Sequence, residues 1–178
     1  MKFELEDLHL KIEFHRCGMM SQESISLDFV FSPDDQIEKE RFQERGQFLY
    51  LWKWNNIVLY AGMTTNSIQN RMNQHKIGMR GNWKNGHCLP GLNKPLVEGK
   101  ERVVGFGSSS GGKKRRFLEN AGIEGFEVWT AVVPPGKDLR ECEKAIIWDI
   151  TLKQIQRLKT SNIECTDKSL CLCLNGLP

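Results

Sequence analysis

Apolar and polar residues alternate with a period near two at the start of the chain. The alternation covers residues 2–14 and 24–31, and it is typical of strands that bury one face. We expect these two strands to pair as a hairpin. The segment SPDD at residues 32–35 then combines a capping hydroxyl, a proline and two carboxylates, which together favour the start of a helix. This helix should end at Gly46.

Two more alternating stretches, residues 48–54 and 57–62, lie on either side of Asn55 and Asn56. Asparagine tolerates the left-handed backbone of a tight turn. The pattern therefore predicts a second, tighter hairpin. Residues 126–133 predict one further strand.

Two stretches show the spacing of apolar residues that is typical of helices. The first begins after Asn66 or Ser67, either of which can cap a helix, and extends to about Gly78. The second covers residues 139–158. Residues 78–125, between them, contain no long periodic run. We therefore expect an α+β fold in which a small central antiparallel or mixed sheet is flanked by helices.

Charge is distributed unevenly along the chain. The formal net charge is +3, but residues 71–116 contain eleven Lys and Arg against two Glu, a net charge of +9. A concentrated positive block suits a surface that binds a polyanion, because each neutralised phosphate releases counterions. A solvated loop that keeps the protein soluble is the alternative. Within the block, residues 105–116 (GFGSSSGGKKRR) predict a flexible cationic loop.

Length and composition indicate one globular domain, since 178 residues with 39% hydrophobic side chains can bury a core. No apolar run approaches the roughly 18 residues of a membrane-spanning helix. The first ten residues are acidic and alternating, unlike a signal peptide. We expect a cytoplasmic, intracellular protein without membrane contact. Its six cysteines form no C-x-x-C pair, so we expect reduced thiols.

One carboxylate lies within the apolar stripe of the last predicted helix. Glu143 comes one turn after Leu139 and one turn before Ile146. Burying an unpaired carboxylate costs roughly several kcal/mol, so this residue needs a cation, a metal ion or donated hydrogen bonds. A salt bridge to an arginine and a metal site are the two alternatives.

A second polar group lies near the predicted tight hairpin. Arg71 and His75 are four residues apart and project from the same side of the first helix. The two tyrosines of the chain, Tyr50 and Tyr60, lie in the preceding hairpin, one in each strand. Core packing alone would explain tyrosines in strands. Together with Glu143, however, these side chains form a coherent polar set.

The order of these residues resembles the GIY-YIG nuclease family. Phe-Leu-Tyr at residues 48–50 stands at the place of the GIY motif, and Tyr-Ala-Gly at residues 60–62 stands at that of YIG. The resemblance covers residues 46–178. The remaining motif positions of the family are matched, in order, by Arg71, His75, Glu143 and Asn175.

The chain departs from the family pattern at three places. Phe48 replaces the first glycine of GIY. Residues 78–125 form a basic insertion that the minimal domain lacks, and residues 1–45 have no counterpart in it. We therefore divide the chain into an N-terminal extension of strands and a helix, residues 1–45, and a nuclease-like domain, residues 46–178.

The resemblance implies a metal-dependent DNA endonuclease. Glu143 would hold Mg²⁺ or Mn²⁺, and Arg71 would clamp the scissile phosphate. Tyr50 would be the general base, which requires cations to lower its pKa from about 10. Tyr60 and His75 would orient the water or relay its proton, and Asn175 would donate structural hydrogen bonds near the site. Nucleic acid would be bound by Arg80, Lys84, Lys113, Lys114, Arg115 and Arg116.

Several alternatives remain open at this point. A compact restriction-type enzyme fits the short chain better than a multidomain repair or mobile-element nuclease, and cutting both strands of a symmetric target is consistent with a homodimer. A noncatalytic nucleic-acid-binding module on the same fold is the second interpretation. The third is a metal-binding or interaction protein that uses its cysteines. Its ligands would be Cys165, Cys171 and Cys173, with His87 or Cys88.

Overall fold

The computed structural model describes most of the first half of the chain and the segment that ends at residue 160. The described residues are 1–23, 29–36, 40, 43–55, 57–80, 83–84, 87–88, 114–115, 118 and 121–160, with only the backbone described at 6, 80, 83–84, 87–88 and 154–160. Within these ranges the fold is α+β, and its main sheet is entirely antiparallel. The sequence-based fold class is therefore confirmed at this level.

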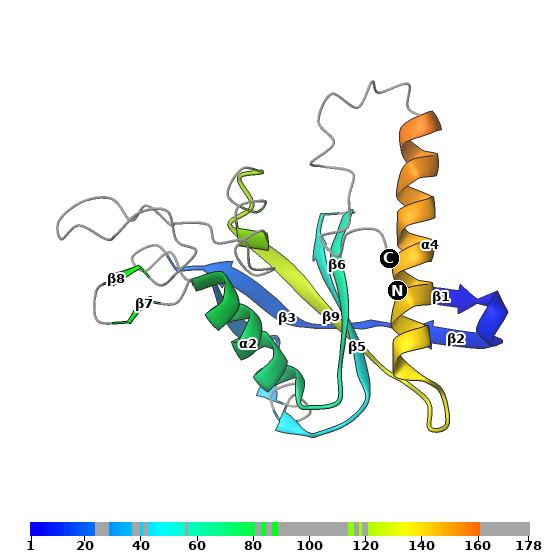
Figure 1. Ribbon diagram of the computed structural model, residues 1–178, viewed down its shortest axis with the longest axis horizontal. Coiled ribbons are helices and arrows are strands. Elements are labelled where there is room, and N and C mark those ends of the chain that lie inside the picture. Colours follow the sequence, from blue (N-terminus) through cyan, green and yellow to red (C-terminus); the bar gives the residue numbers. More distant parts are fainter. Residues whose placement is uncertain are drawn as a thin grey trace.

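A central sheet of five strands organises the described part of the chain, in the order β4-β3-β9-β5-β6. A separate hairpin and a short strand pair accompany it (Figure 1). The central strands are β3 (His15–Gln22), β4 (Phe29–Pro33), β5 (Phe48–Trp54), β6 (Ile57–Thr64) and β9 (Gly125–Val132). The remaining elements are β1 (Lys2–Leu5), η1 (Glu6–Leu8), β2 (Leu10–Glu13), α2 (Ile68–Arg80), β7 (Trp83–Lys84), β8 (His87–Cys88) and α4 (Leu139–Thr160).

The predicted tight hairpin and the helices predicted to follow residue 66 and to cover residues 139–158 are confirmed. Asn55 has a φ of 52° in the turn between β5 and β6. The hydroxyl of Ser67 accepts a hydrogen bond from the backbone N–H of Asn70 at 3.2 Å, which caps the start of α2. Asp138 caps α4 in the same way, since its Oδ1 accepts from the backbone N–H of Arg140 at 2.7 Å.

The predicted pairing at the N-terminus is wrong. Residues 2–14 contain two strands, β1 and β2, which pair with each other around η1 and His9, whose φ is 47°. The strand that pairs with β4 is β3, for which no strand was predicted. A register shift between Arg16 and Gly18, where β3 meets β9, interrupts its period of two and hides it in the sequence.

The helix predicted to start at residues 32–35 begins later. Pro33 is the last residue of β4 and pairs with Gly18 of β3. The backbone N–H of Asp34 then donates to the Cys17 carbonyl at 3.1 Å, so strand pairing continues past the proline. Helical backbone first occurs at Gln36 and is last seen at Gln43, three residues before the predicted end at Gly46.

Two apolar cores lie on opposite faces of the central sheet. On one face, α2 and the end of the insertion, including Leu118 and Ile123, pack against the strands. On the other face, α4 packs together with the β1–β2 hairpin (Figure 1). Because β3 and β4 belong to the same sheet as β5 and β6, part of the predicted N-terminal extension adds two strands to that sheet. Neither α2 nor α4, the two long helices of the described ranges, is apolar over a length that could cross a bilayer.

Candidate active site

The register of β5 against β6 places the aromatic residues of the site on one face of the sheet. Tyr50 pairs with Gly62, and Trp52 pairs with Tyr60. Side chains that pair directly across antiparallel strands point to the same face. This face is the one that α2 covers, and all three aromatic side chains belong to its core.

Gly62 makes room for the phenol of Tyr50. A Cβ atom at residue 62 would overlap the hydroxyl oxygen and Cζ of Tyr50 and would lie 2.9 Å from the ring of Tyr60. Only glycine leaves the space that the Tyr50 side chain occupies. The last residue of the YAG motif therefore has a steric role that the sequence did not reveal.

We expect Gly62→Ala to displace the Tyr50 ring and to lower the free energy of unfolding by roughly 1–3 kcal/mol, the usual cost of overpacking. Denaturant unfolding of the single and double variants measures this effect. In the Tyr50→Ala background the overlap is gone, so Gly62→Ala should then cost much less. An equal cost in both backgrounds would contradict the steric role.

Helix α2 supplies two polar side chains that meet Tyr50. The Tyr50 hydroxyl lies 2.7 Å from Nε2 of His75, and Nε of Arg71 donates to the Tyr50 oxygen at 2.9 Å. A second Arg71 nitrogen, Nη1, donates to the Gln74 side chain at 3.0 Å. The structure therefore brings Tyr50, Arg71 and His75 into one chain of hydrogen bonds.

Burial keeps both Tyr50 and His75 uncharged. The pKa of His75 is lowered to about 2 by burial and by the positive charges of Lys114 and Arg71. The pKa of Tyr50 is raised well above 10, because burial and the neighbouring Tyr60 outweigh the opposing effect of Arg71. When the imidazole proton is on Nδ1, the phenol can therefore donate to Nε2 of His75 while accepting from Arg71.

This pKa corrects the expectation for Tyr50 as a general base. That expectation required nearby cations to lower the phenol pKa, and Arg71 does act in that direction. The phenol is fully buried, however, and desolvation of its anion is the larger effect. Free Tyr50 phenolate is therefore scarce at neutral pH.

The lowered pKa of His75 predicts that acid destabilises the fold through this residue. Between pH 6.5 and about 2 the unfolded chain binds a proton at residue 75 and the folded chain does not. The free energy of unfolding should thus fall by at most about 1.4 kcal/mol per pH unit below 6.5. Chemical denaturation from pH 7 to 4 should show this slope in the wild type and a shallower one in His75→Gln. The exposed His15, replaced in the same way, is the control.

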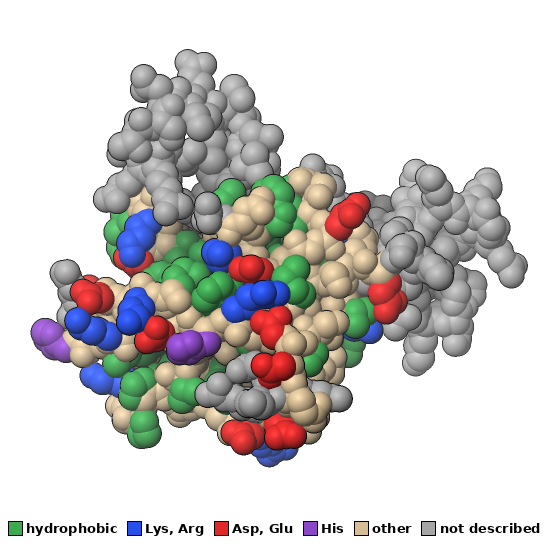
Figure 2. All heavy atoms as spheres, turned by 180° about the vertical axis from the view of Figure 1, so that it is seen from behind, with side chains coloured by type: hydrophobic (Ala, Val, Ile, Leu, Met, Phe, Trp, Pro, Cys, Tyr) green, Lys and Arg blue, Asp and Glu red, His purple; other side chains and the backbone are tan. Residues whose placement is uncertain are grey.

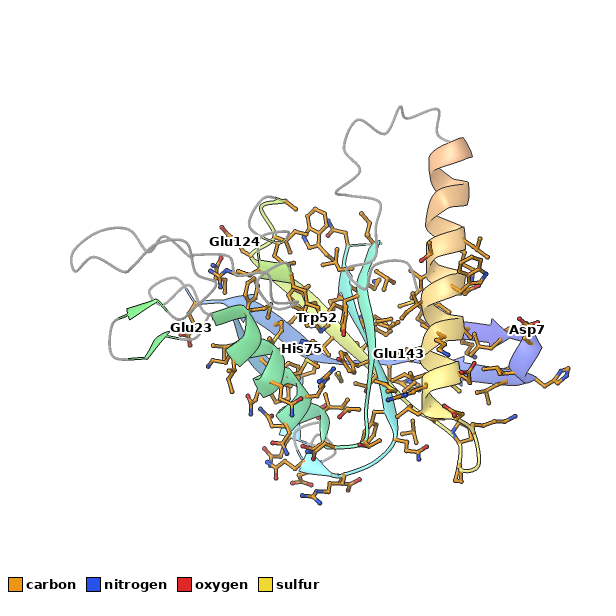
Figure 3. The ribbon with its side chains drawn as sticks, in the orientation of Figure 1. Asp7, Glu23, Trp52, His75, Glu124 and Glu143 are labelled. Carbon is orange, nitrogen blue, oxygen red and sulfur yellow. The ribbon has the colours of Figure 1, made fainter. Side chains whose placement is uncertain are left out.

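Aromatic packing around His75 includes a residue that the sequence analysis did not single out. Trp52 is fully buried, and its ring lies edge-on to His75 with centroids 4.8 Å apart. The rings of Tyr60 and Tyr50 lie 5.4 and 5.6 Å from His75. Figure 3 shows Trp52 and His75 close together between α2 and the sheet. Alternation along β5 could have suggested Trp52, since it lies two residues after Tyr50.

Glu143 approaches the site from the other helix, α4. It is half-buried and accepts a hydrogen bond from the backbone of Met63 in β6, an edge strand of the central sheet. Burial raises its pKa, against the opposing charges of Arg71, Arg140 and Lys114. Figure 3 shows Glu143 on the side of α4 that is nearest the β5–β6 pair. The carboxylate needed donated hydrogen bonds or cations, and the structure supplies both.

Tyr60 connects the carboxylate to the hydrogen-bonded chain. Its ring lies 5.9 Å from that of Tyr50, and its pKa is raised, first by burial. Hydrogen bonding to Tyr50 and the charge of Arg71 oppose this rise, whereas the charge of Glu143 adds to it. Tyr60 is thus electrostatically coupled to Tyr50, Arg71 and Glu143.

The described residues contain no group of three or more His, Cys, Asp or Glu that could hold a metal ion. A magnesium ion is nevertheless often held by one or two carboxylates together with water and phosphate oxygens. Glu143, anchored through Met63, fits that role as a single ligand.

Two residues of the predicted cationic loop, Lys114 and Arg115, are buried, with 6% and 1% of their surfaces exposed. Both have helical backbone. Lys114 lies with its Nζ 3.5 Å from the centroid of the Tyr60 ring, and the guanidinium of Arg115 lies 5.3 Å from that of Phe29. These two residues therefore do not form the expected flexible surface loop. In the view of Figure 2, basic and acidic side chains are interspersed over the described surface.

Some predicted site residues cannot be placed. Lys113, Arg116 and Asn175 lie outside the described residues, as do Cys165, Cys171 and Cys173 of the alternative metal site. Only the backbone is described for Arg80, Lys84, His87 and Cys88.

Comparisons with known proteins give no relative for this arrangement. No protein-family model, no curated protein and no solved structure matches the chain. Its relation to the GIY-YIG family is therefore a resemblance of motif residues.

Proposed function

We propose that the protein is a metal-dependent endonuclease that hydrolyses phosphodiester bonds in DNA. The observation that carries this proposal is the chain of hydrogen bonds from Arg71 through Tyr50 to His75, with Glu143 nearby at the edge of the sheet. The site combines an anion-binding cation, two neutral groups that can pass a proton, and an oxygen ligand for a metal ion.

Arg71 has hydrogen-bond donors left for a phosphate. A guanidinium has five N–H groups, of which one binds Tyr50 and one binds Gln74. Even with a third bond to Tyr60, two N–H groups remain with respect to the described residues. A planar cation with paired donors is well suited to two phosphoryl oxygens.

Tyr50 and His75 provide a path for the proton of the attacking water. The Tyr50 oxygen would accept that proton while its own proton moves to Nε2 of His75, so that no free phenolate is needed. The low pKa of His75 reflects the charges of Arg71 and Lys114 as well as burial. A phosphate bound between these cations would offset their charge and make the imidazole a better proton acceptor.

Glu143 is the residue that would hold the Mg²⁺ or Mn²⁺ ion. When bound, such an ion neutralises charge on the phosphoryl group and on the leaving 3′ oxygen. Met63 holds the carboxylate of Glu143 in place through its backbone N–H. Asn175 keeps its proposed role as a structural hydrogen-bonding residue near the site.

The remaining parts of the proposal concern the target. The +9 charge of residues 71–116 supports a polyanionic partner, and Arg80, Lys84, Lys113 and Arg116 are its proposed contacts outside the site. The proposed enzyme is of restriction type, is cytoplasmic and acts as a homodimer on symmetric sites.

Incubation with mixed plasmid and genomic DNA tests the function. We expect cleavage with Mg²⁺ and none with EDTA, and sequencing of the ends would define the target site. DNA binding without cleavage under any divalent cation would overturn the catalytic proposal in favour of a noncatalytic binding module.

A further inference from the structure

Lys114 reaches the site from the basic insertion, 43 residues after Arg71. Its ammonium nitrogen lies 3.5 Å from the centroid of the Tyr60 ring and 5.2 Å from that of Trp52. Cation–π contacts of this kind position a cation over an aromatic face. The contact places a second cation among the aromatic side chains of the site.

The segment that follows Lys114 is held by the core. Leu118, four residues later in the chain, is fully buried, and its carbonyl accepts a hydrogen bond from the backbone N–H of Ile123 at 2.8 Å. Ile123 is also buried and leads directly into β9. This end of the insertion is therefore packed against the same core as Tyr50 and Trp52.

The charges of the site favour an anion. Arg71 and Lys114 are positive, the carboxylate of Glu143 lies near them, and Tyr50 and His75 are neutral. Lys114 acts on both His75 and Glu143, since its charge lowers the pKa of each. The positive charges of Arg71 and Lys114 together exceed the one negative charge of Glu143, so these three side chains are complementary to a phosphodiester.

We propose that Lys114 is the second phosphate-binding cation of this site, acting on the same phosphoryl group as Arg71. This inference rests on the proposed function, and it makes the insertion part of the active site. Arg71 approaches from α2 and Lys114 from the insertion. A lysine suits the role because its compact charge is carried on a flexible stem that can move from the Tyr60 ring to a phosphoryl oxygen.

The substitution Lys114→Met tests this inference, because methionine keeps an unbranched apolar side chain against Tyr60 and removes the charge. We expect the single-turnover cleavage rate to fall on the order of 10²-fold. The affinity for inorganic phosphate, measured by calorimetry, should fall about tenfold, the effect of losing roughly one charge-assisted hydrogen bond. Lys114→Arg should retain most of the phosphate affinity. The control is Lys144→Met, since Lys144 is exposed and pairs with Glu141 at 2.9 Å.

The outcomes separate this inference from the proposed function. If the wild type cleaves DNA and Lys114→Met has the same cleavage rate and the same phosphate affinity, the role of Lys114 is overturned and the nuclease proposal stands. If the wild type does not cleave DNA but Lys114→Met has lost phosphate affinity, the anion-binding site is supported and the nuclease proposal is rejected.

A measurement on the wild type covers the case in which Lys114→Met does not fold. With ¹³C-labelled lysine, the Cε signal of Lys114, assigned through Lys114→Arg, should shift as inorganic phosphate is added. A signal that does not move at saturating phosphate would overturn the inference.

Discussion

Glu143→Gln should abolish cleavage while leaving DNA affinity within a few-fold of the wild type. The amide keeps the shape of the side chain, and it can still accept from Met63, but it is a poor metal ligand. Single-turnover cleavage and filter binding of the same DNA measure the two effects. We expect a rate loss on the order of 10³ or more, because the charge stabilisation supplied through this residue is lost.

Glu141→Gln is the matched control for this prediction. Glu141 lies on the same helix but is exposed and pairs with Lys144 at 2.9 Å. Its replacement should leave the cleavage rate unchanged. A Glu143→Gln variant that cuts DNA at a rate near that of the wild type would contradict the role of Glu143 as a metal ligand.

Arg71→Ala and Tyr50→Phe should each lower the single-turnover rate by on the order of 10² or more, for different reasons. Arg71→Ala removes both the cation and the donor to the Tyr50 oxygen. Its defect should persist at every pH and at saturating Mg²⁺. Arg71→Lys should not restore the rate, because an ammonium does not reproduce the planar set of donors.

Tyr50→Phe removes the hydroxyl that links Arg71 to His75. If the proton passes through neutral Tyr50 to neutral His75, the wild-type rate should change little between about pH 6 and 9, because neither group titrates there. A rise of about tenfold per pH unit that disappears in Tyr50→Phe would instead identify free phenolate as the base. Tyr60→Phe is the comparison variant, since the pKa of the Tyr60 phenol is also raised.

The cluster of Tyr50, Tyr60, Arg71 and His75 could be anticipated from the sequence because its contacts are local. The turn pairs Trp54 with Ile57, and a register shift between Trp52 and Lys53 then pairs Trp52 with Tyr60, so one tyrosine from each strand falls on the same face. The helix that follows is capped by Ser67, and its residues at a spacing of four then project toward that face.

The contacts that the sequence did not predict are those between distant segments. Lys114 comes after a long insertion without periodic pattern, so nothing in the sequence indicated that it would lie against Tyr60. The pairing of β3 with β9 joins residues more than 100 positions apart and includes a register shift. Sequence separation and charge do not indicate that Lys114 contacts Tyr60 or that β3 pairs with β9.

The state of ionisation also depended on the fold. Cationic neighbours suggested a lowered phenol pKa, but the depth at which Tyr50 is buried cannot be read from the residues alone. The structure buries it fully, so desolvation outweighs the charge of Arg71. The same burial, together with Lys114, keeps His75 neutral.

A crystal structure of Glu143→Gln with a cognate DNA duplex tests the central claim most directly, because this variant is expected to bind without cutting. The account predicts a phosphodiester group in contact with the Arg71 guanidinium and within hydrogen-bonding distance, or one water, of the Tyr50 hydroxyl. DNA bound elsewhere on the protein, with the chain from Arg71 through Tyr50 to His75 unchanged and out of reach of any phosphate, would contradict it.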